Sequence, residues 1–600
     1  MNQLNELAKN GIDFYLDIAL PEDEEIVYED IIKTAKMISH NNFTDPLSLR
    51  NSSFISLGKL RYYTSLINKI NEQLSQCIPL INPTSKTNND IISQRDSISL
   101  SLLLSSVREI ISPKIKNDLL TNIIELSEYD EDLVQIPTFK VDRITAVSSS
   151  GNNVDQVGKA LMKSISKKGD IFLKNFAPFS FLLGGIMNKK KQSIQSEFLQ
   201  VFEQAGKIDP ACYRSKKIDR DHNAFKIEYQ NELVQGLSGP YRQFFSDIAN
   251  ELQSPDAEKD QPQLIIPTEN NVNKKGEFKD KFTLNPSCDE LSQYEFIGIL
   301  MGISIRTGVY LSLDLCSLIW KKIVNEKITI SDIKQFDEGL YQLIVMKEKE
   351  LSEEEIQSTF GGLTSISLTD GKKVELKQYD ITKKEERVKM IDEIVNIRLN
   401  ESSKQIESIK KGISKMLPLS ILNFFTWNEF VCLVCGRKTV DIELLKKNTI
   451  ISPELKENEN LVQWLWEILN EFDDAMRVNF VKFCYAQESL PPNQEEYTKR
   501  QVVFTIKFNP QSKKDQLPRA DTCFFFLIIP QYSSKEIMKK MITIAISMDN
   551  IGMNGDKVNE QSVNSSVHVI NDAFGVFRGA RSGRTFNYGM NFDYGDEEDY

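Results

Sequence analysis

The sequence predicts an α+β protein in which a helical N-terminal region is followed by a large, mainly helical unit and a small α/β unit. Three observations support this fold class. The chain has 600 residues, which is too long for a single ordinary hydrophobic core. Apolar residues recur at helical spacing over residues 1–130 and over much of 193–436. After Gly436, two short runs rich in β-branched and aromatic residues predict strands.

The N-terminal region, residues 1–130, is expected to be helical. Leu60–Leu80 and Ser97–Leu126 carry apolar residues at the spacing of an amphipathic helix. The stretch Ser148–Asn153, rich in Ser, Gly and Asn, predicts a loop. Nothing in residues 1–130 has the pattern of a known recognition module, so a role in substrate choice or in bracing the next unit stays a hypothesis.

Three elements of the large middle unit can be predicted from local pattern. Tyr294–Ile305 is apolar nearly all round, which predicts a buried central helix. In Ser365–Leu376, apolar and polar residues alternate on both sides of the turn sequence Thr-Asp-Gly-Lys, which predicts a β-hairpin. Asp392–Ile413 predicts one long helix.

The unit after Gly436 predicts two helices, two strands and a last helix. These elements are expected at Leu461–Phe472, Ala475–Tyr485, Gln501–Phe508, Cys523–Ile529 and Ser533–Ser547. Ser533 and Glu536 have the spacing of a capping box at the start of the last helix. Residues 557–600 are rich in Asn, Ser and Gly and predict a disordered tail.

Composition argues against several classes of protein. A net charge of −12 and a pI near 5.2 argue against nucleic acid as the main partner. No apolar run is long enough to span a membrane, and the best candidate, Phe176–Met187, is interrupted by Pro178. The chain starts without a signal-peptide pattern, and eight cysteines spread over 600 residues form no disulfide framework. These features predict a reducing compartment, cytoplasmic or nuclear.

Metal and cofactor chemistry are not expected. The three histidines, His40, His222 and His568, lie far apart and outside any metal-ligand spacing. The single CxxC motif, Cys432 to Cys435, sits in a predicted apolar helix that ends at Gly436, and it is interpreted as core packing. No Walker-type phosphate loop is present, so the sequence predicts no cofactor and no metal.

Cys523 is the candidate nucleophile. It lies where the polar segment Leu517–Thr522 becomes the apolar run Phe524–Ile529, a position that suits an exposed thiol on a rigid support. A small apolar residue at the start of a buried strand is the alternative interpretation, because free cysteine is among the most buried residue types. The local sequence leaves both interpretations open.

Several segments, in their order along the chain, share one resemblance. In the small unit they are Leu517-Pro518-x-Ala520-x-Thr522-Cys523-Phe524 and Pro530-x-Tyr532-Ser533-Ser534. In the larger unit they include Leu264-Ile265-Ile266-Pro267, Asn285-Pro286-Ser287, Tyr294-Glu295-Phe296-x-Gly298 and Trp427-Asn428-Glu429-x-x-Cys432-x-x-Cys435-Gly436. On these motifs the chain resembles the HECT ubiquitin ligases over roughly residues 195–555. In detail it is most similar to the HERC-type ligases, without their propeller repeats.

The resemblance implies a bilobal HECT domain and its boundaries. The large, mainly helical N-lobe is expected at residues 131–436, with a conjugating-enzyme-binding subdomain at about 338–420. A hinge at 437–440 and the small α/β C-lobe at 441–556 follow.

The resemblance also implies a two-step acyl transfer. A conjugating enzyme docks on the N-lobe, ubiquitin passes to Cys523 as a thioester, and it then passes to a lysine of a protein substrate. Thr522, Asp521 and Arg519 belong to the same catalytic segment. Arg519 favours the attacking thiolate. Asp521 stands where the family usually has histidine. It is a candidate base for the incoming lysine, but it could instead oppose Arg519 by raising the pKa of the thiol, or it could simply be solvated.

The docking groove for the conjugating enzyme can be carried over position by position. Five apolar residues match it, although each could instead pack inside the subdomain: Leu340, Ile344, Ile356, Met390 and Ile394. A catalytically weak adaptor, which binds a conjugating enzyme or a substrate without transfer, is the alternative function. The retained Thr522-Cys523 pair favours the enzyme, whereas Asp521 and the long tail keep the adaptor open.

Overall fold

The structure is a computed structural model that describes residues 31, 34, 62–72, 108–128, 136–142, 196–214, 223–230, 238–254, 263–456 and 458–553. The predicted loop at Ser148–Asn153, the apolar segment Phe176–Met187 and the tail 557–600 lie outside these residues. The described chain mixes many helices with small sheets, in agreement with the predicted α+β class.

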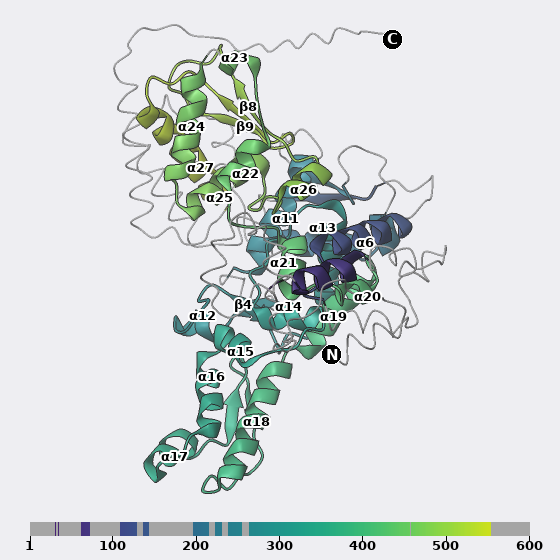
Figure 1. The fold of residues 1–600 in the computed structure, drawn as a ribbon, viewed down its shortest axis with the longest axis vertical. Helices are drawn as coiled ribbons and strands as arrows, with labels where there is room; N and C mark the ends of the chain where they lie inside the picture. The colour runs from purple at the N-terminus through teal and green to yellow at the C-terminus, as the bar shows by residue number, and fades with distance from the viewer. Residues whose placement is uncertain are drawn as a thin grey trace, which may run out of the picture.

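Two separate hydrophobic cores organise the described residues. The first core runs from Ile31 to Cys435 and the second from Val440 to Ile546. Figure 1 shows the elements of the second core at the top and those of the first core below them. The change of core falls in the segment for which the sequence predicts a hinge, residues 437–440.

The first core is built mainly from helices. They are α6 (Pro113–Leu126), α10 (Glu197–Ala205), α11 (Ser238–Leu252), α12 (Glu269–Asn273), α13 (Leu291–Thr307), α14 (Ser317–Ile323), α15 (Ile330–Phe336), α16 (Glu338–Val345), α17 (Glu353–Phe360), α18 (Lys384–Asn400), α19 (Ser403–Ser414), α20 (Leu419–Leu422) and α21 (Trp427–Cys435), with the 3-10 turns η4 (Pro210–Arg214) and η5 (Met346–Glu348). Its strand pairs are parallel β1 (Thr138–Val141) with β2 (Lys226–Tyr229), antiparallel β3 (Ile265–Pro267) with β4 (Phe282–Leu284), and antiparallel β5 (Ser365–Ser367) with β6 (Lys373–Glu375). The helical residues 62–72 and α6 contribute to this same core.

Helix α13 is the predicted buried central helix, and the prediction is confirmed. It packs against α19 with almost no side chain between the two backbones. A Cβ added at Gly298 would lie 2.0 Å from the carbonyl oxygen of Ile409, and one added at Gly412 would lie 1.8 Å from that of Glu295. Only glycine permits so close an approach.

The predicted hairpin is confirmed by β5 and β6, but the single long helix at Asp392–Ile413 is wrong. The chain forms α18 and α19 there, with a break at Glu401 and Ser402. Contacts with distant segments hold this break. The Glu401 carboxylate accepts a hydrogen bond from the Thr369 amide at 3.2 Å, and the Ser402 hydroxyl donates to the Leu284 carbonyl at 3.0 Å.

The second core surrounds a four-stranded sheet with the order β7-β8-β10-β9, in which only β9 is antiparallel to its neighbour. Its strands are β7 (Thr449–Ile451), β8 (Phe504–Phe508), β9 (Arg519–Asp521) and β10 (Phe526–Ile529). Its helices are α22 (Ile442–Lys447), α23 (Pro453–Lys456), α24 (Glu459–Glu471), α25 (Asp474–Tyr485), α26 (Gln494–Lys499) and α27 (Lys535–Met553). The two predicted helices before the strands are therefore confirmed as α24 and α25.

Local sequence placed three boundaries in this unit wrongly. The strand expected from Gln501 begins at Phe504, because Gln501 has a left-handed backbone with φ of 52°. The strand expected from Cys523 begins at Phe526. Ser534, not Ser533, caps the last helix by accepting a hydrogen bond from the Ile537 amide at 3.4 Å, since Ser533 is bound to Asp515.

Candidate active site around Cys523

Cys523 lies in a tight turn between two strands. In the β9–β10 pair, Asp521 stands opposite Phe526, so Thr522–Phe525 form a four-residue turn, named the Cys523 turn below. The Phe524 amide donates to the Asp521 carbonyl at 3.2 Å and closes it. Cys523 is half-buried. The turn therefore presents a partly exposed thiol on a hydrogen-bonded support.

Phe525 anchors the Cys523 turn in the second core. Its backbone is left-handed, with φ of 56°, which is costly for a residue with a bulky side chain. Its ring is 2% exposed and lies with its centroid 4.5 Å from that of Tyr485 and 4.8 Å from that of Phe504. Burial of this aromatic ring offsets the backbone strain.

The outer side of the Cys523 turn is aromatic. Phe524 is 63% exposed and stacks on Phe526 with a centroid distance of 5.3 Å. The ammonium of Lys507 lies 3.7 Å from the centroid of the Phe526 ring. An exposed aromatic surface beside a partly exposed thiol suits contact with another macromolecule.

The other predicted site residues lie on this hairpin. Thr522 and Asp521 are half-buried beside Cys523, whereas Arg519 is exposed at the far end of β9. Arg519 and Asp521 share one face of the strand because side chains alternate along β-structure.

Four other cysteines of the described chain are poorly suited to act as nucleophiles, because a thiol must ionise to attack and burial raises their pKa values. Burial raises the pKa of Cys316 to about 11 and that of Cys435 to about 12. Burial also raises the pKa values of Cys288 and Cys432. The Cys435 thiol donates to the Leu313 carbonyl at 3.6 Å, as expected for a packing role.

Two residues of the first core touch the Cys523 turn, and local sequence did not predict either contact. Arg242 of α11 donates from Nη2 to the carbonyl oxygens of Thr522 and Cys523, at 2.5 and 3.0 Å. A Cβ placed on Gly239 would lie 2.9 Å from the Cys523 Sγ. Both residues belong to the sequence Gly239-Pro240-Tyr241-Arg242, whose local pattern gives no sign of a contact with residues 522 and 523.

Comparison with known proteins shows to which family the chain belongs. Residues 232–554, more than half of the chain, match the HECT-domain (ubiquitin-transferase) family. The chain belongs to the HECT family. The match includes Cys523, its turn and both contacting residues from α11.

Relatives of this HECT chain include very large ligases. E3 ubiquitin-protein ligase HERC2 of Mus musculus is 29% identical over 333 residues, which are 54% of this chain and 7% of that protein. Human HERC2 is 28% identical over the same length, and the probable E3 ubiquitin-protein ligase HECTD4 of Homo sapiens is 27% identical over 361 residues, 9% of its length. The chain thus spans less than a tenth of the length of these relatives. The predicted HERC-type resemblance is confirmed.

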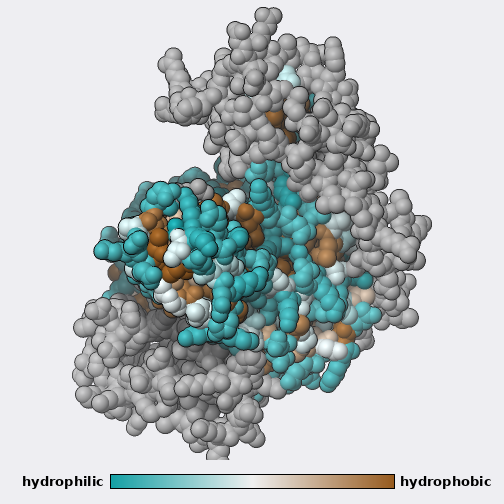
Figure 2. Space-filling model, turned by 90° about the horizontal axis from the view of Figure 1, so that it is seen from below, coloured by the Kyte–Doolittle hydropathy of each residue, from teal (hydrophilic) through white to brown (hydrophobic). Residues whose placement is uncertain are grey.

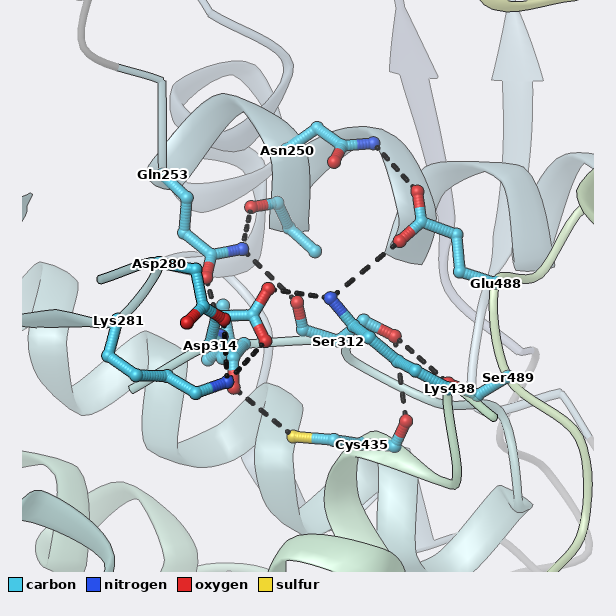
Figure 3. Close-up of polar contacts among 12 residues, drawn as sticks. Asn250, Gln253, Asp280, Lys281, Ser312, Asp314, Cys435, Lys438, Glu488 and Ser489 are labelled. Atoms are coloured by element: carbon cyan, nitrogen blue, oxygen red, sulfur yellow. Dashed lines mark hydrogen bonds and ion pairs between the residues drawn. The ribbon is translucent and has the colours of Figure 1, made fainter. Parts of the chain in front are cut away.

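A charged network joins the two cores of the HECT chain beside the 437–440 segment (Figure 3). The Lys438 ammonium lies 2.6 Å from a carboxylate oxygen of Asp314 and 4.0 Å from one of Glu488. Lys281 pairs with Asp314 at 3.1 Å, and Lys482 pairs with Glu488 at 3.0 Å. Each carboxylate is therefore shared between two lysines.

The five residues predicted for the docking groove lie on α16, α17 and α18, at the end of the molecule opposite the second core (Figure 1). Leu340, Met390 and Ile394 are buried within the first core. Ile344 and Ile356 are half-buried and retain surface. Figure 2, a view of this end of the molecule, shows hydrophobic side chains gathered between hydrophilic ones.

No helix among the residues that the structure describes is both long and apolar enough to cross a bilayer. Among these same residues, no cluster of three or more His, Cys, Asp or Glu side chains could hold a metal ion.

Proposed function

We propose that this chain transfers ubiquitin to protein substrates and that Cys523 carries the ubiquitin as a thioester. The observation that carries the proposal is the HECT match together with the half-buried Cys523 in the tight turn of its β9–β10 hairpin. The relatives, which are described as E3 ubiquitin-protein ligases, support the same reaction.

The chemistry requires two acyl transfers. In the first, the Cys523 thiolate attacks the thioester carbonyl of ubiquitin on a conjugating enzyme. A new C–S bond forms and the thiolate of the conjugating enzyme leaves. In the second, a substrate lysine amine attacks the Cys523 thioester, an amide bond forms, and Cys523 leaves as thiolate. Asp521, two residues from Cys523, takes the proton that the amine loses.

The two cores correspond, in this proposal, to the two lobes of the HECT domain. The N-lobe comprises residues 131–436, the C-lobe comprises 441–556, and residues 437–440 form the hinge. The separation of the buried residues into two clusters supports this division. The N-terminal helices brace the N-lobe, since residues 62–72 and α6 contribute to its core.

A conjugating enzyme docks, we propose, on the subdomain at about 338–420. Ile344 and Ile356 would contact it, because both are half-buried residues of α16 and α17, which lie at this end of the molecule (Figure 1). Leu340, Met390 and Ile394 would support the groove from within the core. We also propose a cytoplasmic or nuclear compartment, because eight cysteines spread over 600 residues form no disulfide framework.

A thioester assay tests this function. Protein, activating enzyme, several conjugating enzymes, ATP and labelled ubiquitin are combined, and adducts are resolved with and without reductant. Wild type should form a reductant-sensitive adduct that Cys523→Ala abolishes. Cys432→Ala, which removes a half-buried thiol of the first core, should retain the adduct. A folded wild type that forms no adduct with any conjugating enzyme would instead support the adaptor function.

A further inference from the structure

Arg242 donates hydrogen bonds to the Cys523 turn and to Tyr485 at the same time. Its Nη2 atom donates to the Thr522 and Cys523 carbonyls, and its Nε atom donates to the Tyr485 carbonyl at 3.1 Å. Its guanidinium carbon lies 4.5 Å from the centroid of the Tyr485 ring. All of these partners belong to the second core, whereas Arg242 belongs to α11 of the first.

The surroundings hold Arg242 in this position. The residue is 8% exposed, and a buried guanidinium is tolerated only when its donors are satisfied. Its own carbonyl accepts a hydrogen bond from the Gln487 side chain at 3.1 Å. The same Gln487 accepts from the Tyr310 amide at 2.8 Å, so it also joins the two cores.

Gly239 provides the space for this contact. It lies one helical turn before Arg242 on α11, and a Cβ there would lie 2.9 Å from the Cys523 Sγ and 3.1 Å from the Thr522 Oγ1. Any larger residue at position 239 must therefore displace the thiol. Gly239 and Arg242 together bring the Cys523 turn against α11.

We propose that Arg242 is a positioning residue that fixes the direction of the Cys523 thioester for its transfer to lysine. This inference rests on the proposed ubiquitin transfer. Arg242 holds the carbonyls of Cys523 and of the residue before it, so it limits rotation of the backbone from which Sγ projects. A planar guanidinium can bind several carbonyls in fixed geometry, which a lysine ammonium cannot. Orienting a reacting group is a large source of rate enhancement.

The contact serves the second transfer rather than the first. The proposed docking surface on α16–α18 lies at the opposite end of the molecule from the Cys523 turn (Figure 1). A conjugating enzyme bound there meets Cys523 only after the contact with Arg242 is broken. Loading of Cys523 therefore does not require the Arg242 contact and should not slow when the contact is lost, whereas discharge to lysine depends on it.

Single-turnover kinetics of Arg242→Ala, Arg242→Lys and Gly239→Ala test the inference. We expect discharge of the Cys523 thioester to free lysine to slow by about tenfold or more in Arg242→Ala. Arg242→Lys should slow it nearly as much, and Gly239→Ala should slow it to a lesser extent. The rate of loading should not fall below that of wild type, because the contact is broken before loading. Because alanine favours helix over glycine, Gly239→Ala does not weaken α11 itself.

Arg477→Ala is the matched control. Arg477 of α25 also donates to two carbonyls, those of Leu469 and Asn470, each at 2.9 Å, but all three residues belong to the second core. We expect this variant to discharge ubiquitin at the wild-type rate. Unchanged discharge in Arg242→Ala, or loading slowed as much as discharge, would overturn the inference.

Alkylation of Cys523 gives a measurement that needs no ubiquitin. Iodoacetamide should modify Cys523 about tenfold faster in Arg242→Ala than in wild type, because the turn is released from α11. Modification of Cys432 is the internal reference. If wild type forms no thioester, the proposed function fails, and the alkylation rate alone tests whether Arg242 holds the Cys523 turn. Faster modification then supports the Arg242 contact, and an unchanged rate rejects it.

Discussion

The aromatic rings of Phe525 and Tyr485 lie with their centroids 4.5 Å apart, and this contact joins the Cys523 turn to the body of the second core. Tyr485 is also the residue whose ring and carbonyl contact Arg242. Tyr485, at the end of α25, thus supports the Cys523 turn from within the second core and also contacts Arg242 of the first core.

Phe525→Ala should destabilise the second core. We expect the free energy of unfolding to fall by about 3–5 kcal/mol, because the variant removes a buried ring and leaves a cavity. Phe524→Ala, at the exposed neighbouring position, should change it by about 0.5 kcal/mol or less. Urea denaturation followed by tyrosine and tryptophan fluorescence measures both. Equal losses in the two variants would contradict the anchoring role of Phe525.

Asp521→Asn should slow the transfer of ubiquitin from Cys523 to lysine by about 10²-fold, because general bases contribute roughly that factor or more. Formation of the thioester should be unchanged, since no amine is deprotonated in that step. Single-turnover discharge to free lysine measures the effect. Asp521→His, which introduces the usual family residue, is the comparison variant. Wild-type discharge by Asp521→Asn would exclude Asp521 as the base.

Lys438→Met should weaken the network between the two cores. It removes one of the two lysine partners of Asp314 and of Glu488. We expect a loss of about 1 kcal/mol in the free energy of unfolding at pH 7, because Lys438 is 40% exposed and each carboxylate keeps its other lysine. Lys438→Arg keeps the charge and should lose less. Thermal unfolding of the three proteins measures the difference. Equal stability of Lys438→Met and wild type at pH 7 would contradict the prediction.

The contribution of Lys438 to the free energy of unfolding should also depend on pH. Burial raises the pKa of Asp314, but Lys438 and Lys281 outweigh it and hold the pKa below 3.8. Burial likewise raises the pKa of Glu488, but Lys482 and Lys438 hold it below 4.5. A lowered carboxyl pKa stabilises the fold above the unfolded value and loses this effect as pH falls through the folded value. The difference between Lys438→Met and wild type should therefore shrink below pH 4.5.

Glu251→Gln should remove a pH dependence of the free energy of unfolding whose sign is opposite to that expected for Asp314 and Glu488. Burial raises the pKa of Glu251 to about 7, despite hydrogen bonds from Ser196 and the Phe198 amide at the start of α10. A raised carboxyl pKa stabilises the fold at low pH and loses this effect as pH rises from 4.5 through about 7. Wild type should lose up to about 3 kcal/mol over this range, and Glu251→Gln should not. Glu228→Gln, on an exposed position of β2, should behave as wild type in thermal unfolding between pH 4 and pH 8.

Ile356→Asp should weaken binding of a conjugating enzyme by about tenfold or more, as expected for an apolar contact residue at an interface. Calorimetric titration and the rate of thioester formation both measure this loss. Ile450→Asp is the control, because Ile450 is 58% exposed on β7 of the second core, far from α17. Wild-type affinity in Ile356→Asp would remove α17 from the proposed docking surface.

Local sequence predicted the elements whose pattern is decided within a few residues. The helix around Tyr294–Ile305 and the hairpin around Gly371 are examples, because an apolar pattern on all sides and a turn sequence can each be recognised within a few residues. The break between α18 and α19 could not be predicted, since it depends on Thr369 and Leu284. The support of Cys523 by Arg242 joins residues 281 positions apart in the chain, and no periodicity encodes such a contact. The family motif alone pointed to Cys523.

The close packing of α13 against α19 at Gly298 and Gly412 has a consequence for how inherited substitutions in this chain should be interpreted. At Gly298 and Gly412 even one methyl group meets a main-chain oxygen, so every substitution there damages the scaffold and reduces the amount of protein in the cell. At Gly239 the added methyl meets only a side-chain thiol and hydroxyl, so a substitution leaves abundance intact and alters the reaction. Measuring protein abundance beside activity would therefore sort variants at these glycines into two mechanistic groups.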